Sequence, residues 1–125
     1  MTVYSLPEKQ AGEELEPNVV ISRDRMDDNE TFKAYVDRQI GYMTTDIPQF
    51  DLLNDRFGNI KNVSARDVRC RWMTPGGRVQ QRLIFLSPGR GEVVTFAATA
   101  ADDFFESHAD IFNAVLGSLS IEEVN

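Results

Sequence analysis

Cysteine and histidine are nearly absent from this sequence, and their scarcity excludes several kinds of chemistry. The 125 residues contain a single cysteine, Cys70, and a single histidine, His108. An internal disulfide bond and a zinc site built from several cysteines are therefore excluded. Most metal sites and most acid–base pairs also need histidines that this chain lacks. We therefore expect a protein that is not an enzyme and that holds no metal and no cofactor.

Basic residues are in deficit as well. The chain has 13 lysines and arginines against 20 aspartates and glutamates, which gives a formal net charge of −7. Nucleic acids and anionic membrane surfaces attract proteins through basic surfaces that release counterions. The composition therefore predicts a partner that is neither a nucleic acid nor an anionic membrane.

Long apolar runs are also missing. No apolar stretch approaches the length that crosses a bilayer. The first eight residues, MTVYSLPE, have neither the basic start nor the apolar stretch of a secretory signal peptide. With one thiol and no such signal, we expect a cytoplasmic protein that does not insert into a membrane.

What the sequence does contain is typical of one folded domain. Hydrophobic residues make up 42% of the chain and charged residues 26%, a balance that disordered chains do not have. A chain of this length also buries enough surface to fold without cross-links. We expect a single domain over residues 1–125, in which the polar stretch 8–17 forms a loop between two strands.

Two segments have the apolar periodicity of amphipathic helices. The first is predicted to follow Asp27, Asp28 and Asn29 and to end at Ile47, before Pro48. The second is predicted from about residue 102 to about residue 120. The acidic pairs 27–28 and 102–103 are expected to cap these helices, because the spacing of a calcium-binding loop is absent. The apolar stripes are Phe32, Val36, Ile40 and Met43 in the first helix and Phe105, Phe112, Leu116 and Leu119 in the second.

Strand signals surround the two helices. Short β-branched or alternating runs predict strands over residues 19–23, 50–57, 68–72, 78–86 and 92–98, in addition to one before the polar loop. Turns at residues 74–77 and 87–91 join the last three strands into an antiparallel meander. The order β, β, α, β, β, β, β, α predicts an α+β fold in which both helices cover one face of the sheet.

Three residue groups that could carry chemistry have simpler structural explanations. Cys70 and His108 are the only conceivable nucleophile and base, but Cys70 alternates with Val68 and Trp72 and is expected to pack in the core. The glycines at 76, 77, 89 and 91 are expected to form turns, because none precedes a helix or a Lys-Ser/Thr pair. The strand arginines are expected to pair with carboxylates at the surface; they are Arg23, Arg69, Arg71, Arg78 and Arg82.

The predicted sheet has more apolar surface than two helices on one face can cover. Residues 19–21, 83–86 and 93–96 are largely apolar at consecutive positions, so both faces of the sheet are apolar. Two explanations stay open: a second copy of the chain covers the free face, or that face forms a groove for a guest. The polar groups available to such a groove are Ser22, Gln39, Gln80, Gln81 and Thr95.

Several short motifs occur in an order that resembles a known family. They are VISRD at residues 20–24, YVDRQI at 35–40, IPQF at 47–50, RW at 71–72, VQQR at 79–82 and FNAVLGSL at 112–119. Together they resemble the DcrB-like proteins, and among these the Eag chaperones of bacterial type VI secretion. The resemblance covers nearly the whole chain from Asn18 onward.

This resemblance implies a Mog1/PsbP-like α+β fold and a cytoplasmic homodimer. It also implies a non-enzymatic chaperone-adaptor that binds the N-terminal transmembrane helices of an effector of the Rhs or PAAR type and helps to load it on the VgrG spike. The alternative is a general DcrB/Mog1-like binding or scaffold protein without a membrane-helix client. A charge placed at Ile21 or Phe96 is expected to disrupt folding or client binding. The expected client-binding residues are Val20, Ser22, Gln39, Gln81, Leu83 and Phe96.

Overall fold

The computed structural model describes residues 2–5 and 17–119, the first of these segments by its backbone alone. Its elements follow the predicted order. The predicted loop over residues 8–17 lies outside the described residues except for Pro17, and so does the predicted helix end at residue 120. The elements are β1 (Thr2–Ser5), β2 (Asn18–Arg25), α1 (Phe32–Asp46), β3 (Asp51–Ile60), β4 (Val63–Thr74), β5 (Gly77–Gly89), β6 (Glu92–Ala101), two short 3-10 turns, η1 (Asp102–Phe104) and η2 (Glu106–His108), and α2 (Ala109–Ser118).

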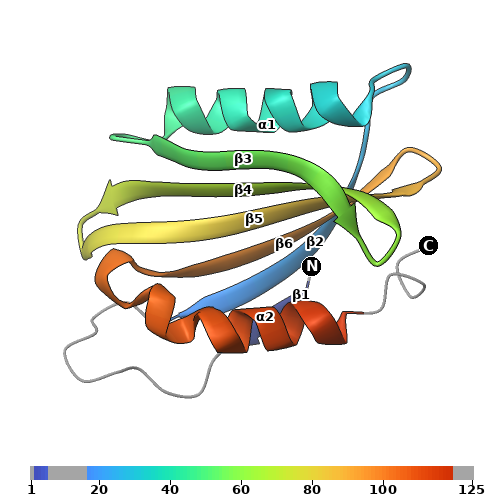
Figure 1. Cartoon of the computed structure of the whole chain (residues 1–125). Helices are drawn as coiled ribbons and strands as arrows, with labels where there is room; N and C mark the ends of the chain where they lie inside the picture. The colour runs from blue at the N-terminus through green and yellow to red at the C-terminus, as the bar shows by residue number, and fades with distance from the viewer. Residues whose placement is uncertain (1, 6–16, 120–125) are drawn as a thin grey trace.

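The described strands form one six-stranded antiparallel sheet in the order β1-β2-β6-β5-β4-β3 (Figure 1). The strands from β3 to β6 are consecutive hairpins, and β2 pairs with β6 along its whole length. β3 and β4 are longer than the sequence pattern predicts, because their turn is only Lys61 and Asn62, with φ of 53° and 66°. Two successive positive φ angles match the twist of a tight two-residue hairpin turn. The sequence pattern predicts shorter strands because residues 58–62 have the composition of a loop.

The two helices lie on opposite faces of the sheet (Figure 1), so the expectation that both cover one face is wrong. α1 packs over Val68, Leu83 and Phe85, whereas Phe112 of α2 packs over Phe96 on the other face. The sheet is apolar on both faces, as predicted, and each face therefore needs its own cover. Helical periodicity identifies the buried side of a helix but does not specify which face of the sheet that side contacts.

The helix starts also differ from the prediction. Thr31, rather than Asp27 or Asp28, caps α1: its Oγ1 accepts a hydrogen bond from the Ala34 N–H at 3.1 Å. The predicted second helix is divided, because the acidic pair at residues 102–103 begins η1 while α2 itself begins at Ala109. α1 ends with Ile47 as its C-cap, just before Pro48 as predicted.

Candidate functional site

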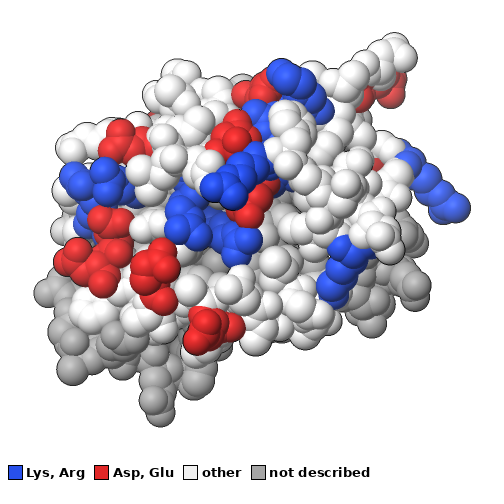
Figure 2. Space-filling model, viewed as in Figure 1, with Lys and Arg blue, Asp and Glu red and all other residues white. Residues whose placement is uncertain are grey.

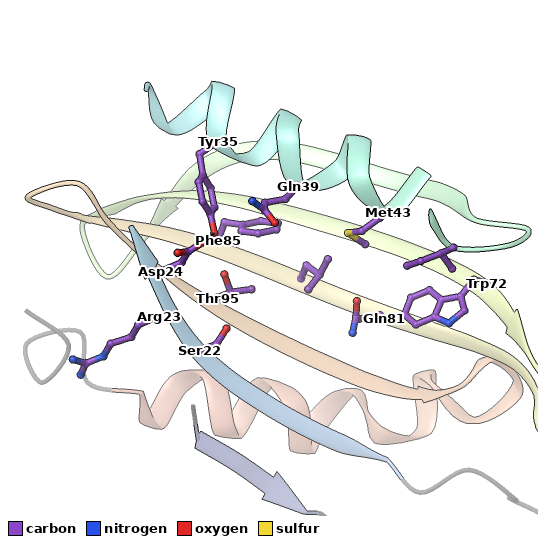
Figure 3. Close-up of a pocket in the computed structure, with 12 residues that line it drawn as sticks. Ser22, Arg23, Asp24, Tyr35, Gln39, Met43, Trp72, Gln81, Phe85 and Thr95 are labelled. Atoms are coloured by element: carbon purple, nitrogen blue, oxygen red, sulfur yellow. Dashed lines mark hydrogen bonds between the residues drawn. The ribbon is translucent and has the colours of Figure 1, made fainter. Parts of the chain in front are cut away.

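A groove of about 490 Å³ lies between α1 and the sheet (Figure 3). α1 packs closely over β4 and β5, whereas β2 and β6 present small side chains to the same face, among them Ser22, Thr95 and Ala97. These side chains are too short to fill the space beside the helix. The groove is lined by Ser22, Arg23, Asp24, Tyr35, Gln39, Met43, Ile47, Trp72, Gln81, Leu83, Phe85 and Thr95.

A hydrogen bond between α1 and β2 marks one end of the groove. The Tyr35 hydroxyl donates to Asp24 Oδ2 at 2.7 Å, and the Tyr35 ring is buried edge-on against Phe85. Burial and the neighbouring Asp24 carboxylate raise the pKa of Tyr35, so its hydroxyl stays protonated and keeps donating. The side chain of Arg23 points away from the other residues of the groove (Figure 3).

The other end of the groove is apolar. Met43 and Ile47, at the end of α1, and Trp72, on β4, line it and are all half-buried. Covering these half-buried side chains with a further apolar group is favourable, because it removes apolar surface from water. The groove therefore runs from a polar end to an apolar end.

Amide and hydroxyl groups lie between these ends. Gln81 Nε2 donates to Thr99 Oγ1 at 2.9 Å. Within the described part of the chain, the side chains of Ser22, Gln39 and Thr95 have no hydrogen-bond partner, and all three are half-buried. These groups keep donors and acceptors available for a bound molecule.

Four of the six expected client-binding residues line the groove: Ser22, Gln39, Gln81 and Leu83. Val20 lies on the same face of β2 as Ser22, opposite Ala97 of β6, but outside the groove lining.

Phe96 does not belong to the site. It is fully buried on the opposite face of the sheet, in the cluster that α2 covers. Gln80 likewise alternates away from the groove-lining Gln81. Two groove residues that the sequence reasoning did not predict as client-binding, Tyr35 and Met43, carry a weak signal: they lie four residues before and four residues after the predicted Gln39, on one face of a helix.

Cys70 and His108, the only candidates for a nucleophile and a base, lie on opposite sides of the sheet. Cys70 is fully buried beneath α1, whereas His108 is buried beside Phe112 on the α2 side. Burial raises the pKa of the Cys70 thiol to about 12. The sheet separates the two side chains, so they do not form a catalytic pair.

The Cys70 thiol is expected to resist alkylation by iodoacetamide in the native protein at pH 8. The thiolate is the reactive form, and burial suppresses both its formation and its contact with the reagent. Denaturation should raise the rate of alkylation by at least about 100-fold. A native rate close to the denatured rate would contradict this burial.

The same burial predicts a pH dependence of stability. Above about pH 8.5 the unfolded thiol ionises while the folded one does not, so the free energy of unfolding should fall as the pH rises.

Charged side chains of both signs are interspersed on the face that Figure 2 shows. Three of the predicted surface arginines pair as expected, Arg69 with Glu106, Arg71 with Asp51 and Arg82 with Asp67. Arg66, which the sequence reasoning did not single out, has the least exposed side chain of the arginines in the ion pairs of the described residues. No three metal-binding side chains cluster in the described part of the chain. None of its helices has the length and apolar character needed to cross a membrane.

An antiparallel sheet with one helix on each face defines an α+β fold, and this fold matches those of PsbP and LpqN. The chain superposes on the PsbP protein of Synechocystis sp. PCC 6803 with a TM-score of 0.63 and 14% identity, over 93% of this chain and 79% of that protein. It superposes on LpqN, a Mycobacterium tuberculosis protein involved in cell envelope biogenesis, with a TM-score of 0.66 and 19% identity, over 89% of this chain and 64% of LpqN.

The family follows from the sequence match. The DcrB family model matches residues 1–118, and the chain belongs to that family. It is also similar to PA94, a Pseudomonas aeruginosa protein of unknown function that has been suggested to be a regulator. The two superpose with a TM-score of 0.84 and 24% identity, over 95% of this chain and 81% of PA94. No curated protein matches the chain.

Proposed function

We propose that this protein is a chaperone-adaptor of type VI secretion. It binds the hydrophobic N-terminal transmembrane segment of an effector of the Rhs or PAAR type and aids the loading of that effector on the VgrG spike. The observation that carries the proposal is the groove under α1. It combines half-buried apolar side chains with the side chains of Ser22, Gln39 and Thr95, which have no hydrogen-bond partner among the described residues.

A transmembrane helix in water exposes apolar side chains along its whole length. Covering that surface is worth about 25 cal/mol per Å². Met43, Ile47 and Trp72 offer apolar surface for this purpose. A volume of about 490 Å³ holds the side chains of one stripe of such a helix rather than the whole helix.

The polar groups of the groove suit the same guest. Membrane helices associate through small residues and through hydrogen bonds from Ser, Thr, Asn and Gln side chains. Gln39 on α1 faces the groove opposite Thr95 of β6 (Figure 3), so a guest helix between them meets donors from two sides. In this proposal the protein acts without catalysis, in the cytoplasm and as a homodimer. Its net charge of −7 keeps the complex soluble and away from anionic lipid.

Binding of a synthetic apolar helix tests the proposal. A fluorescent Leu/Ala-rich peptide of about 20 residues, the length that spans a bilayer, serves as the probe in buffer without detergent. The wild-type protein is expected to keep it soluble. The substitution Thr95→Arg, which places a long cation in the groove, is expected to weaken binding at least about tenfold.

Ala114→Arg is the matched control, because Ala114 is exposed on α2, on the other side of the sheet. It should leave binding unchanged, and both variants should keep the thermal midpoint of the wild type. Equal binding by the wild type and the Thr95→Arg variant would contradict the groove as the site. Failure of the wild-type protein to bind the peptide, or to keep an effector's N-terminal fragment soluble on co-expression, would favour a binding protein without a membrane-helix client.

A further inference from the structure

One end of the groove carries a negative charge. Of the described residues that line the groove, only Arg23 and Asp24 are charged. They are neighbours on β2, so their side chains point to opposite faces of the sheet. Asp24 faces α1 and accepts the hydrogen bond from the Tyr35 hydroxyl, whereas the side chain of Arg23 points away from the groove (Figure 3). The groove is therefore anionic at this end and uncharged along the rest of its lining.

The Asp24 carboxylate has capacity for a further donor. Its Oδ2 accepts from the Tyr35 hydroxyl at 2.7 Å, and its Oδ1 accepts from the backbone N–H of Arg25 at 2.8 Å. An ionised carboxylate can accept about four hydrogen bonds, so about half of its capacity remains. Among the described residues, Asp24 takes part in no ion pair.

Two arginines next to this end are engaged elsewhere. Arg38 donates two hydrogen bonds to the Glu30 carboxylate, both at 2.8 Å, and its guanidinium lies 5.3 Å from the centroid of the Tyr35 ring. Arg25 pairs with Glu92 at 3.8 Å. Each of these arginines has a carboxylate partner of its own. A cation from a guest therefore reaches Asp24 without breaking an ion pair there.

The apolar end lies about 18 Å from the anionic end along α1. Tyr35 and Ile47 are twelve residues apart in the chain, and an α-helix rises about 1.5 Å per residue. Between the two ends the described lining offers amide, hydroxyl and apolar groups and no charge. A guest helix laid alongside α1 therefore contacts the groove over about twelve of its own residues.

We infer that the groove selects an apolar helix with a lysine or arginine directly before its apolar stretch, and that Asp24 binds this basic residue. The inference rests on the proposed function, because the guest is the same apolar helix. A charge-assisted hydrogen bond to the Asp24 carboxylate fixes the basic residue, and the apolar residues that follow extend toward Met43 and Trp72. A basic residue in the middle of the guest would instead lose water against an uncharged lining.

The helix dipole decides which end of the guest lies at Asp24. The first N–H groups of a helix have no partner and carry a partial positive charge, whereas its last carbonyl groups carry a partial negative charge. The N-terminal end of the guest is therefore attracted to Asp24, and the C-terminal end is repelled. A guest bound in this way runs in the same direction as α1, from Tyr35 toward Ile47.

Two peptides of identical composition test the inference. Both contain one Leu/Ala core of about 20 residues with acetylated and amidated ends. One has Lys-Lys before the core and Glu-Glu after it, and the other has the reverse order. Their equal net charge removes any difference in general attraction to the acidic protein. The wild-type protein is expected to bind the peptide with lysines first about fivefold more tightly, and this preference should shrink in high salt.

Asp24→Asn is the variant that isolates the charge, because it keeps an oxygen that can accept from the Tyr35 hydroxyl. It should still bind both peptides but lose the preference between them. Comparing the two affinities within each protein also cancels any difference in helicity between the peptides. The matched control is Asp110→Asn, which makes the same change of charge at an exposed position on α2, on the other side of the sheet, and should keep the preference.

The outcomes separate this inference from the proposed function. Equal binding of the two peptides by the wild type, or a preference that persists in Asp24→Asn, would overturn the role of Asp24 and leave the chaperone role intact. Tighter binding of the peptide with lysines last would overturn the orientation inferred from the helix dipole. A wild-type protein that binds neither peptide would refute both proposals.

Discussion

Replacement of Phe96 by alanine is expected to lower the free energy of unfolding by about 3–5 kcal/mol. The Phe96 ring is fully buried and packs, together with Ile84, Phe105 and Phe112, under α2. Removing it leaves a cavity that a sheet core cannot collapse to fill. Chemical denaturation followed by tryptophan fluorescence measures the loss. A change below 1 kcal/mol would mean that the α2 face is not packed as described.

The adjacent residue provides the matched control for this experiment. Thr95 is next to Phe96 in the chain but faces the groove on the opposite side of the sheet. Thr95→Ala is expected to change the free energy of unfolding by less than about 1 kcal/mol. The expectation that a charge at Ile21 or Phe96 would disturb folding or client binding can therefore be sharpened. Both residues lie under α2, so a charge at either position should unfold the protein.

Replacement of Arg66 by alanine should cost about 2–3 kcal/mol of unfolding free energy. The guanidinium pairs with Asp37 of α1 at 2.6 Å and with both carboxylate oxygens of Asp55 of β3, and its side chain is only 6% exposed. Without it, two carboxylates approach each other with no cation between them. The cost is below that of a fully buried pair because Asp37 and Asp55 keep some contact with water.

Arg69 serves as the control for Arg66. It lies three residues along the same strand, and its partner Glu106 is 77% exposed. Arg69→Ala is expected to cost less than about 1 kcal/mol, as exposed ion pairs usually do. Thermal unfolding of the two variants side by side checks the contrast. Equal losses would show that burial does not distinguish the two ion pairs.

Much of the groove could be predicted from the sequence, because its residues lie in motifs with clear periodicity. Ser22, Gln39, Gln81 and Leu83 lie in segments that the sequence predicts as strands or as the first helix, and all four line the groove. The prediction that Phe96 binds the client is wrong for a physical reason. β6 is apolar at consecutive positions, such as Val93 and Val94, so hydrophobicity does not reveal which of its residues face α1.

The contacts that join distant segments could not be predicted in this way. The hydrogen bond from Tyr35 to Asp24 and the pairing of Arg66 with Asp37 and Asp55 depend on how α1 crosses the sheet. Asp24 and Asp55 are two of many carboxylates in an acidic chain, and nothing local distinguishes them. The place of β3 at one edge of the sheet likewise depends on the strand order, which puts this strand last.

By itself, the sequence determined the class of protein: one α+β chain of eight main elements in a definite order, acidic, with one cysteine and one histidine. These properties depend on composition and on periodicities of 2 and 3.6 residues, which are local. Only the tertiary structure decided that α1 and α2 cover opposite faces and that small side chains on β2 and β6 leave a groove beside α1. A sheet that is apolar on both faces accepts a helix on either face. The path of the chain between the elements makes that choice.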